Sequence, residues 1–362
     1  MTSLSERRDR LRLARAENVG PVTFRELVRR YGGATRALAA LPELSRRGGR
    51  AQPLRTPSVA DAEREIAAGE ALGAVLLTTG EAAFPPLLAA LDPPPPLIWA
   101  RGRAELLERP AVAIVGARIA SAAGQRFARG LAAELGQAGY AIVSGMARGI
   151  DAAAHEGSLA SGSVAVLAGG VDDVYPPEHR ALYARLAADG CVVSESPPGT
   201  AAQARDFPRR NRLISGLAQA VVVVEAEMRS GSLITARLAV EQGREVLAVP
   251  GSPLDPRARG TNDLIRQGAA ICEGAEDVLR ALEGLASVRE PPRDATPSGD
   301  ACDGDLEALR ERIADLLSPT PIPRDEIIRA TGESAAIVAA ALTELALAGR
   351  ADLLPGGFAV KA

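Results

Sequence analysis

The residues best suited to bind an anion lie in one short segment. Phe207-Pro208-Arg209-Arg210-Asn211-Arg212 holds three arginines, an asparagine and an aromatic ring within six residues. Arginine donates hydrogen bonds to phosphate oxygens, and an aromatic ring can stack on a nucleobase. The apolar Leu213 and Ile214 that follow would dock this segment against a folded core, which disfavours an ordinary solvated run of charge. We therefore expect a loop here that contacts a nucleic acid.

Three further segments place small residues beside arginine. They are Gly116-Ala117-Arg118, Ser144-Gly145-Met146-Ala147-Arg148 and Arg229-Ser230-Gly231-Ser232, each leading into a predicted helix. Helix N-termini offer free N–H groups and a favourable dipole to an anion. The glycine spacing after Gly116 is not that of a dinucleotide-binding fingerprint, so a nicotinamide dehydrogenase is disfavoured. The residues predicted to contact nucleic acid are Gly116, Arg118, Ser144, Gly145, Arg148, Phe207, Arg209, Arg210, Asn211, Arg212, Arg229, Ser230, Gly231 and Ser232.

Catalytic and metal-binding chemistry find little support. Asp151 and His155 are four residues apart on a predicted helix, so they could act together as an acid/base pair or as two metal ligands. At the start of a buried helix such a pair is more often structural. The chain has three cysteines, widely spaced, and two histidines, which disfavours a disulfide framework or a zinc site. We expect no catalytic residue, no metal and no cofactor.

The four anion-binding segments follow apolar runs that alternate with helical segments. Continuous valine, isoleucine and alanine runs of this kind are typical of parallel strands buried on both faces. They predict a Rossmann-like, doubly wound, mostly parallel α/β sheet, with residues 96–102 as an edge strand. Because ligands of such sheets bind beyond the carboxyl ends of the strands, we expect the four segments to meet at one edge. The runs are 112–115, 141–143, 164–167, 192–193, 221–224 and 246–249.

Proline-rich and polar stretches divide the chain. We expect an N-terminal helical domain of the SAM or helix-hairpin-helix type at 1–72, the Rossmann-like domain at 73–285, a linker at 286–304 and a winged-helix domain at 305–362. The third winged-helix helix, 334–348, contains no lysine or arginine. A major-groove reader needs such side chains, so this module is expected to brace the protein or to contact another protein.

Charge and hydropathy limit the class of protein. A net charge of −3 argues against coating nucleic acid with the whole surface, so any site is local. We find no signal peptide and no apolar stretch of membrane-spanning length, which makes the cytoplasm the expected location.

The motifs, taken in order, resemble the DNA-processing protein A family, also called DprA or Smf. The resemblance spans roughly residues 75–280 and implies a dimer that binds and protects incoming single-stranded DNA and loads the recombinase RecA during natural transformation and homologous recombination. Where this family more often has serine, Ala117 stands here. The matching motifs are Val112-Ala113-Ile114-Val115-Gly116-Ala117-Arg118, Ser144-Gly145-Met146-Ala147-Arg148-Gly149-Ile150-Asp151-Ala152-Ala153-Ala154-His155, Phe207-Pro208-Arg209-Arg210-Asn211-Arg212, Ser230-Gly231-Ser232-Leu233-Ile234-Thr235-Ala236-Arg237 and Val249-Pro250-Gly251 with Arg259-Gly260-Thr261-Asn262.

Two alternatives stay open. The first is a Rossmann-type nucleotide phosphoribohydrolase similar to the lysine-decarboxylase-like family. The stretch 228–236 lacks the glutamate of that family's motif, so Glu225 or Glu227 would have to supply the acid/base. The second is an interaction hub whose DNA contact is incidental. In every case Leu264 and Ile265 are candidate dimer contacts, although core packing explains them equally well.

Overall fold

The computed structural model describes residues 4–286 and 306–362. The chain divides into two compact units. One unit consists of residues 65–91 and 98–290 and contains the central sheet. The other combines residues 1–64, 92–97 and 291–362 and contains the terminal helical domains. Most of the predicted linker, residues 287–304, lies outside the described residues, as does Cys302.

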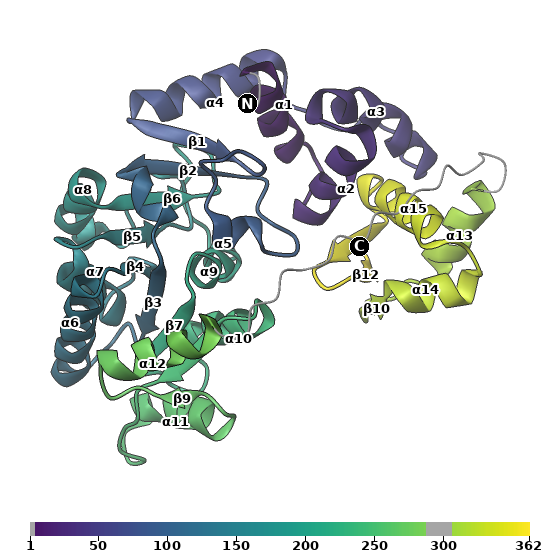
Figure 1. The fold of residues 1–362 in the computed structure, drawn as a ribbon. Helices are drawn as coiled ribbons and strands as arrows, with labels where there is room; N and C mark the ends of the chain where they lie inside the picture. Colours follow the sequence, from purple (N-terminus) through teal and green to yellow (C-terminus); the bar gives the residue numbers. More distant parts are fainter. Residues whose placement is uncertain (1–3, 287–305) are drawn as a thin grey trace. The chain divides into compact units, whose positions relative to one another are not determined.

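The sheet of the first unit has nine strands in the order β1-β2-β6-β5-β4-β3-β7-β8-β9 (Figure 1). Strands β3 to β9 pair in parallel, whereas β2 runs antiparallel to β6. This confirms the predicted doubly wound, mostly parallel α/β fold. The strands are β1 (Ala74–Thr78), β2 (Leu97–Gly102), β3 (Ala111–Gly116), β4 (Ala141–Ser144), β5 (Ser163–Val166), β6 (Cys191–Ser194), β7 (Ala220–Val224), β8 (Glu245–Ala248) and β9 (Ala270–Ile271).

The strand order reverses between β3 and β7. From β3 the chain builds outward through β4, β5 and β6, and it then returns to the other side of β3 for β7, β8 and β9. Such a reversal leaves a crevice outside the carboxyl ends of the two central strands, where doubly wound proteins bind their ligands. The topology therefore fixes the place of the candidate site.

Helices cover both faces of the sheet because the central strands carry apolar side chains on both faces. On β3, Val112 and Ile114 face the cluster formed with α6, α7 and α12, while Ala113 and Val115 face the cluster formed with α5, α9 and α10. The helices of this unit are α5 (Pro86–Ala89), α6 (Ala122–Gln137), α7 (Ile150–Ser158), α8 (Arg180–Asp189), α9 (Asp206–Gly216), α10 (Gly231–Glu241), α11 (Arg259–Arg266) and α12 (Ala275–Ala286), with short 3-10 turns at Ala104–Glu108, Pro177–His179 and Pro256–Ala258.

The predicted edge position of residues 96–102 is wrong. β2 lies second in the sheet, because Ala74–Thr78 forms an additional outer strand, β1. Trp99 on β2 is fully buried and its indole N–H donates to Glu65 at 3.2 Å. A Cβ placed on Gly69 would lie 2.2 Å from the Trp99 ring. The Trp99 ring therefore fits only because position 69, in the helix that packs on it, is a glycine.

The second unit contains the N-terminal helices and a winged helix. The helices α1 (Leu4–Ala14), α2 (Pro21–Tyr31) and α3 (Ala34–Arg47) form the predicted N-terminal helical domain, and the division between the two units falls within α4 (Val59–Ala71). The predicted three helices and hairpin are α13 (Leu306–Leu316), α14 (Arg324–Thr331), α15 (Ala335–Leu347), β11 (Ala351–Leu354) and β12 (Phe358–Lys361). A two-residue strand, β10 (Ile322–Pro323), completes a three-stranded sheet that was not predicted.

Within this unit the end of α15 packs on the N-terminal helices. Leu347 is fully buried in the cluster that α1, α2 and α3 form around Phe24 and Leu27. The Asn18 amide donates to the Leu347 carbonyl oxygen at 3.2 Å. The third helix of the winged helix is therefore braced by the N-terminal domain of the same chain.

No single helix of the described residues is long and apolar enough to cross a membrane. Taken together, α14 and α15 are long and apolar enough for a membrane span, but the pair is bent by 111° at the break between the two helices.

Candidate nucleic-acid interface

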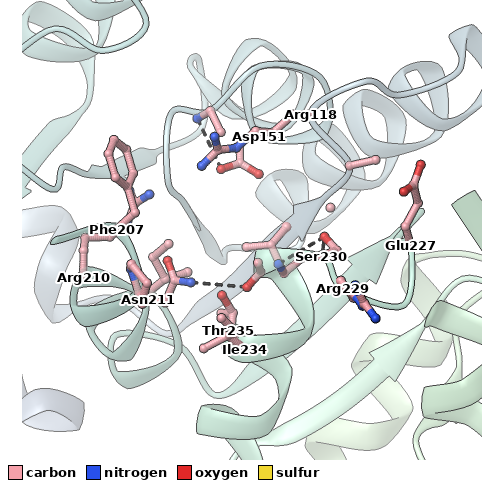
Figure 2. Close-up of a pocket in the computed structure, with 18 of the residues that line it drawn as sticks. Arg118, Asp151, Phe207, Arg210, Asn211, Glu227, Arg229, Ser230, Ile234 and Thr235 are labelled. Atoms are coloured by element: carbon pink, nitrogen blue, oxygen red, sulfur yellow. Dashed lines mark hydrogen bonds between the residues drawn. The ribbon is translucent and has the colours of Figure 1, made fainter. Parts of the chain in front are cut away.

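A pocket of about 630 Å³ lies at the crevice between β3 and β7. Its walls come from the loops after β3, β4, β5 and β7 and from α9, so five segments far apart in the sequence meet at one edge. Figure 2 shows labelled side chains from α9 on one side of the pocket and those around the start of α10 on the other. Of the predicted site residues, the pocket is lined by Gly116, Arg118, Phe207, Arg210, Asn211, Arg229, Ser230, Gly231 and Ser232.

The loop after β3 presents an arginine above an aromatic ring. A Cβ on Gly116 would lie 1.8 Å from the Val224 carbonyl oxygen, so only glycine lets the loop leave the sheet at this point. Arg118 is exposed, and its guanidinium carbon lies 5.6 Å from the centroid of the Phe207 ring. This is cation–π geometry, and it holds a positive charge at the mouth of the pocket.

Phe207 also contacts a second aromatic residue. The centroids of Phe207 and Tyr175 are 5.3 Å apart, with an interplanar angle of 63°. Tyr175 lines the pocket and is 46% exposed. Sequence analysis missed Tyr175, which follows β5 and stands 32 residues before its partner. The available signal was a tyrosine before two prolines, in the loop that follows the apolar run 164–167.

The arginine-rich segment is helical and not a loop as predicted. Helix α9 begins at Asp206, whose carboxylate accepts the N–H of Gln203 at 2.8 Å. Successive residues on a helix point about 100° apart, so the three arginines face different surroundings. Arg209 is exposed and lies outside the pocket lining. Arg212 is paired with Glu195, both partly buried.

Arg210 is turned inward. It is only 7% exposed, and its guanidinium donates to the carbonyl oxygens of Gly145, at 2.8 Å, and Val166. Burial lowers its pKa to about 10. A Cβ on Gly145 would lie 2.8 Å from the guanidinium nitrogens, so glycine is required beside it. Arg210 therefore supports the loop after β4 from below.

Asp151 holds the same loop from the other side. Its carboxylate accepts the N–H groups of Gly145 at 3.1 Å and Ala147 at 3.3 Å. Burial raises its pKa, and the nearby Arg210 opposes that shift. His155 is fully buried, and its Nδ1 lies 2.8 Å from the Ser163 hydroxyl oxygen. Burial lowers the pKa of His155 to about 3. These contacts agree with a structural role for both side chains.

Two predicted residues after β4 have internal partners. Ser144 is fully buried, and its hydroxyl donates to the Ile114 carbonyl oxygen at 2.7 Å. Arg148 is about half exposed and pairs with Glu178. Gly145 and Arg148 border a small cavity next to Phe207 and Tyr175 rather than the main pocket.

The start of α10 forms the opposite wall. The Ser230 hydroxyl accepts the N–H of Ser232 at 3.3 Å and lies 2.7 Å from the Ser232 hydroxyl. The Asn211 amide donates to the Gly231 carbonyl oxygen at 3.3 Å, which ties α9 to the start of α10. Arg229 is exposed just before this helix. Hydroxyl groups, helix N–H groups and an arginine thus converge on one place, an arrangement of groups that suits an anion.

The predicted dimer contacts lie on α11. Leu264 is half-buried and packs against the core cluster that includes Leu213 and Val223. Ile265 beside it is also half-buried. Asn262 in the same helix accepts the Gly251 N–H at 3.2 Å and donates to the Gly251 carbonyl oxygen at 2.9 Å. These two hydrogen bonds join the motif 249–251 to the motif 259–262, which gives both motifs a structural role.

The fold and the site together define a doubly wound α/β protein with a pocket lined by arginine and serine at its topological switch point. The family model of DNA recombination-mediator protein A matches residues 75–283. The DprA-like N-terminal HHH domain matches residues 5–68, and the DprA winged helix domain matches residues 291–357. The chain belongs to the DNA recombination-mediator protein A family.

Relatives and solved structures agree with this membership. Protein Smf of Escherichia coli K12 is 39% identical over 281 residues, which cover 76% of this chain and 74% of that protein. The X-ray structure of DNA processing protein A from Streptococcus pneumoniae superposes with a TM-score of 0.65 at 31% identity, covering 77% of this chain and 98% of that one. The DNA processing protein A of Helicobacter pylori, whose structure concerns its single-stranded DNA binding mode, gives a TM-score of 0.54 at 28% identity, covering 59% and 96%.

Proposed function

We propose that this chain binds single-stranded DNA in the pocket between β3 and β7, without catalysing a reaction. The observation that carries the proposal is the convergence on one pocket of an exposed arginine stacked on an aromatic ring and a serine-rich helix N-terminus. Membership in the recombination-mediator family and the binding mode studied in the Helicobacter pylori protein support it.

The two walls of the pocket suit different parts of a strand. The N-terminus of α10, with Ser230, Ser232 and Arg229, offers donors to a phosphate. On the other wall, Phe207 and Tyr175 offer ring surface to a base, and Arg118 adds a charge beside it. Contacts of this kind depend on the backbone and on any base's π-face, so the binding is expected to be largely independent of sequence.

The proposal of a non-catalytic protein rests on the two glutamates that the hydrolase alternative would require. Glu225 is occupied by hydrogen bonds to Ser121. Glu227 is exposed to solvent on the rim of the pocket. Release of free base from a nucleoside monophosphate, lost on mutating Glu225 or Glu227, would favour the hydrolase instead.

A salt titration tests the binding site. Fluorescence anisotropy with single- and double-stranded oligonucleotides is measured over a range of salt concentrations. Each phosphate neutralised contributes about −0.7 to the logarithmic slope, so Arg118→Ala and Arg229→Ala should each make the slope shallower. The matched control is Arg103→Ala, an exposed arginine at the opposite edge of the sheet. Affinity that ignores salt and both pocket variants would contradict the proposal.

We further propose that the bound strand is handed to the recombinase RecA and that the chain acts as a homodimer through the surface around Leu264 and Ile265. RecA filament formation on DNA already coated with single-strand-binding protein, with and without this chain, tests the handover. Light scattering of Ile265→Glu tests the dimer. No acceleration of filament formation, or an unchanged mass for the variant, would contradict the respective proposal.

A further inference from the structure

A carboxylate of the chain itself lies over the N-terminus of α6. Glu225 directly follows β7, and its side chain reaches across the switch point to the start of α6. One carboxylate oxygen accepts the Ser121 N–H at 2.8 Å, and the other accepts the Ser121 hydroxyl. The Ser121 hydroxyl oxygen in turn accepts the Gly124 N–H at 2.9 Å. The first turn of α6 is therefore closed by an internal anion.

The surroundings are shaped around this carboxylate. A Cβ on Gly124 would lie 2.7 Å from the Glu225 carboxyl carbon and 2.8 and 2.9 Å from its oxygens. Any residue other than glycine would push the carboxylate off the helix. Glu225 itself has a φ of 54°, a left-handed backbone that glutamate rarely adopts. The glycine at position 124 and the left-handed backbone of Glu225 are therefore both needed to place this carboxylate.

In doubly wound proteins that bind nucleotides, a phosphate commonly lies at a helix N-terminus such as the one that Glu225 covers here. In doubly wound sheets the helix after the first strand of the switch point receives the ligand's phosphates at its N-terminus. Here that strand is β3 and that helix is α6. We propose that Glu225 is a specificity-determining residue that excludes free nucleotides by holding its carboxylate in the phosphate position of α6.

The second helix at the switch point is left open by comparison. The N-terminus of α10 is capped by the neutral hydroxyl of Ser230. An incoming phosphate meets a carboxylate on the N-terminus of α6, whereas the N-terminus of α10 presents hydroxyl and N–H groups, with Arg229 and Glu227 on the rim beside it. The difference in capping directs phosphates to the side of the crevice that borders the 630 Å³ pocket.

Space for a nucleotide exists beside the carboxylate. A second cavity of about 390 Å³ is bordered by Glu225, Gly124, Phe127 and the loop 249–252. This volume is in the range of small-molecule sites. The barrier to nucleotide binding is therefore the carboxylate at the helix terminus, through its charge and through the place it occupies, and not a lack of room in the cavity beside it.

The test measures binding of ADP and of inorganic pyrophosphate by isothermal titration calorimetry. Glu225→Gly removes the carboxylate and suits the left-handed backbone, and Glu225→Gln removes only the charge. We expect no ADP binding by the unchanged chain at millimolar concentration, at least tenfold tighter binding by Glu225→Gly, and a smaller gain for Glu225→Gln. Glu227→Gln is the matched control, because it removes the same charge two residues further along and should bring a much smaller gain.

Three outcomes would overturn the inference: ADP binding by the unchanged chain, equal affinities for the unchanged chain and both Glu225 variants, or the same gain from Glu227→Gln. If Glu225→Gly does not fold, as judged by circular dichroism, Glu225→Gln still decides the question. The inference does not depend on strand binding. Titrating the same proteins with single-stranded DNA separates the two, because a chain that ignores DNA contradicts the proposed function and leaves the nucleotide result readable.

Discussion

The contact between α15 and the N-terminal helices can be tested with one methyl group. Gly48 follows α3 with φ −69° and ψ −3°, a conformation that alanine adopts without strain. Gly48→Ala would place its Cβ 2.1 Å from the Glu344 carbonyl oxygen and 2.9 Å from the Ala348 Cβ. The substitution is harmless to the N-terminal domain by itself, and it clashes only if α15 packs as the structure shows.

Gly48→Ala should change the free energy of unfolding in opposite directions with and without the contact between α15 and the N-terminal helices. Glycine to alanine at a compatible position stabilises by about 0.4–1 kcal/mol through the unfolded chain. Overpacking a closed contact costs about 1–3 kcal/mol. With the contact present we therefore expect a net loss of about 1–2 kcal/mol, seen as a lower melting temperature in calorimetry of the whole chain. Leu347→Ala, which empties a fully buried position of the same cluster, should cost about 2–5 kcal/mol.

The control is Gly20→Ala in the same unit, where an added Cβ meets nothing within 4 Å. Gly20 is the N-cap of α2: alanine caps a helix less well than glycine, but it also stabilises by about 0.4–1 kcal/mol through the unfolded chain, so the two effects largely offset each other. A melting temperature that rises for Gly48→Ala would refute the contact, and with it the interpretation of the winged helix as a braced module.

Three further predictions concern single side chains. Burial lowers the pKa of His155 to about 3, so between pH 6.5 and 3 the unfolded chain binds a proton that the folded chain does not. The free energy of unfolding should fall by up to about 1.4 kcal/mol per pH unit below pH 6.5, and His155→Gln should lose this dependence in urea titrations between pH 5 and 7. Arg210→Ala removes the guanidinium that opposes the pKa shift of the buried Asp151 and that binds the carbonyl oxygens of Gly145 and Val166. It should cost about 3–5 kcal/mol in the same assay, whereas a loss of under 1 kcal/mol would show that Arg210 is not a buried support. Glu195→Ala frees Arg212 from its ion pair and should tighten single-strand binding several-fold at low salt, whereas Arg212→Ala should weaken it. Equal effects of the two substitutions would contradict the idea that Glu195 competes with DNA for Arg212.

The central sheet was predictable because its strands are nearly continuous apolar runs. In an open parallel sheet, the carboxyl ends of those runs locate the ligand edge, so Gly116, Arg118 and Ser230 were found from their positions alone. The resemblance to a known family agreed with both. These predictions needed only one-dimensional periodicity and a topological rule.

The direction of individual side chains was not predictable. Arg209, Arg210 and Arg212 are equivalent in sequence, yet one is exposed, one is buried beneath a loop and one is paired with a glutamate. Their roles depend on the phase of α9, which starts at Asp206. Tyr175 and Glu225 were overlooked as partners of Phe207 and Ser121 because each contact joins loops that only the folded sheet brings together.

The buried Trp99 on β2 makes the intrinsic fluorescence of the protein a probe of the sheet. Trp99 is the sole tryptophan of the chain, and it lies in the unit that contains the sheet. Its emission should therefore be that of an indole shielded from water and should shift to longer wavelength only when the sheet unit opens. Melting of the terminal helical domains would leave the signal unchanged, so fluorescence and circular dichroism recorded on one sample would resolve the unfolding of the two units.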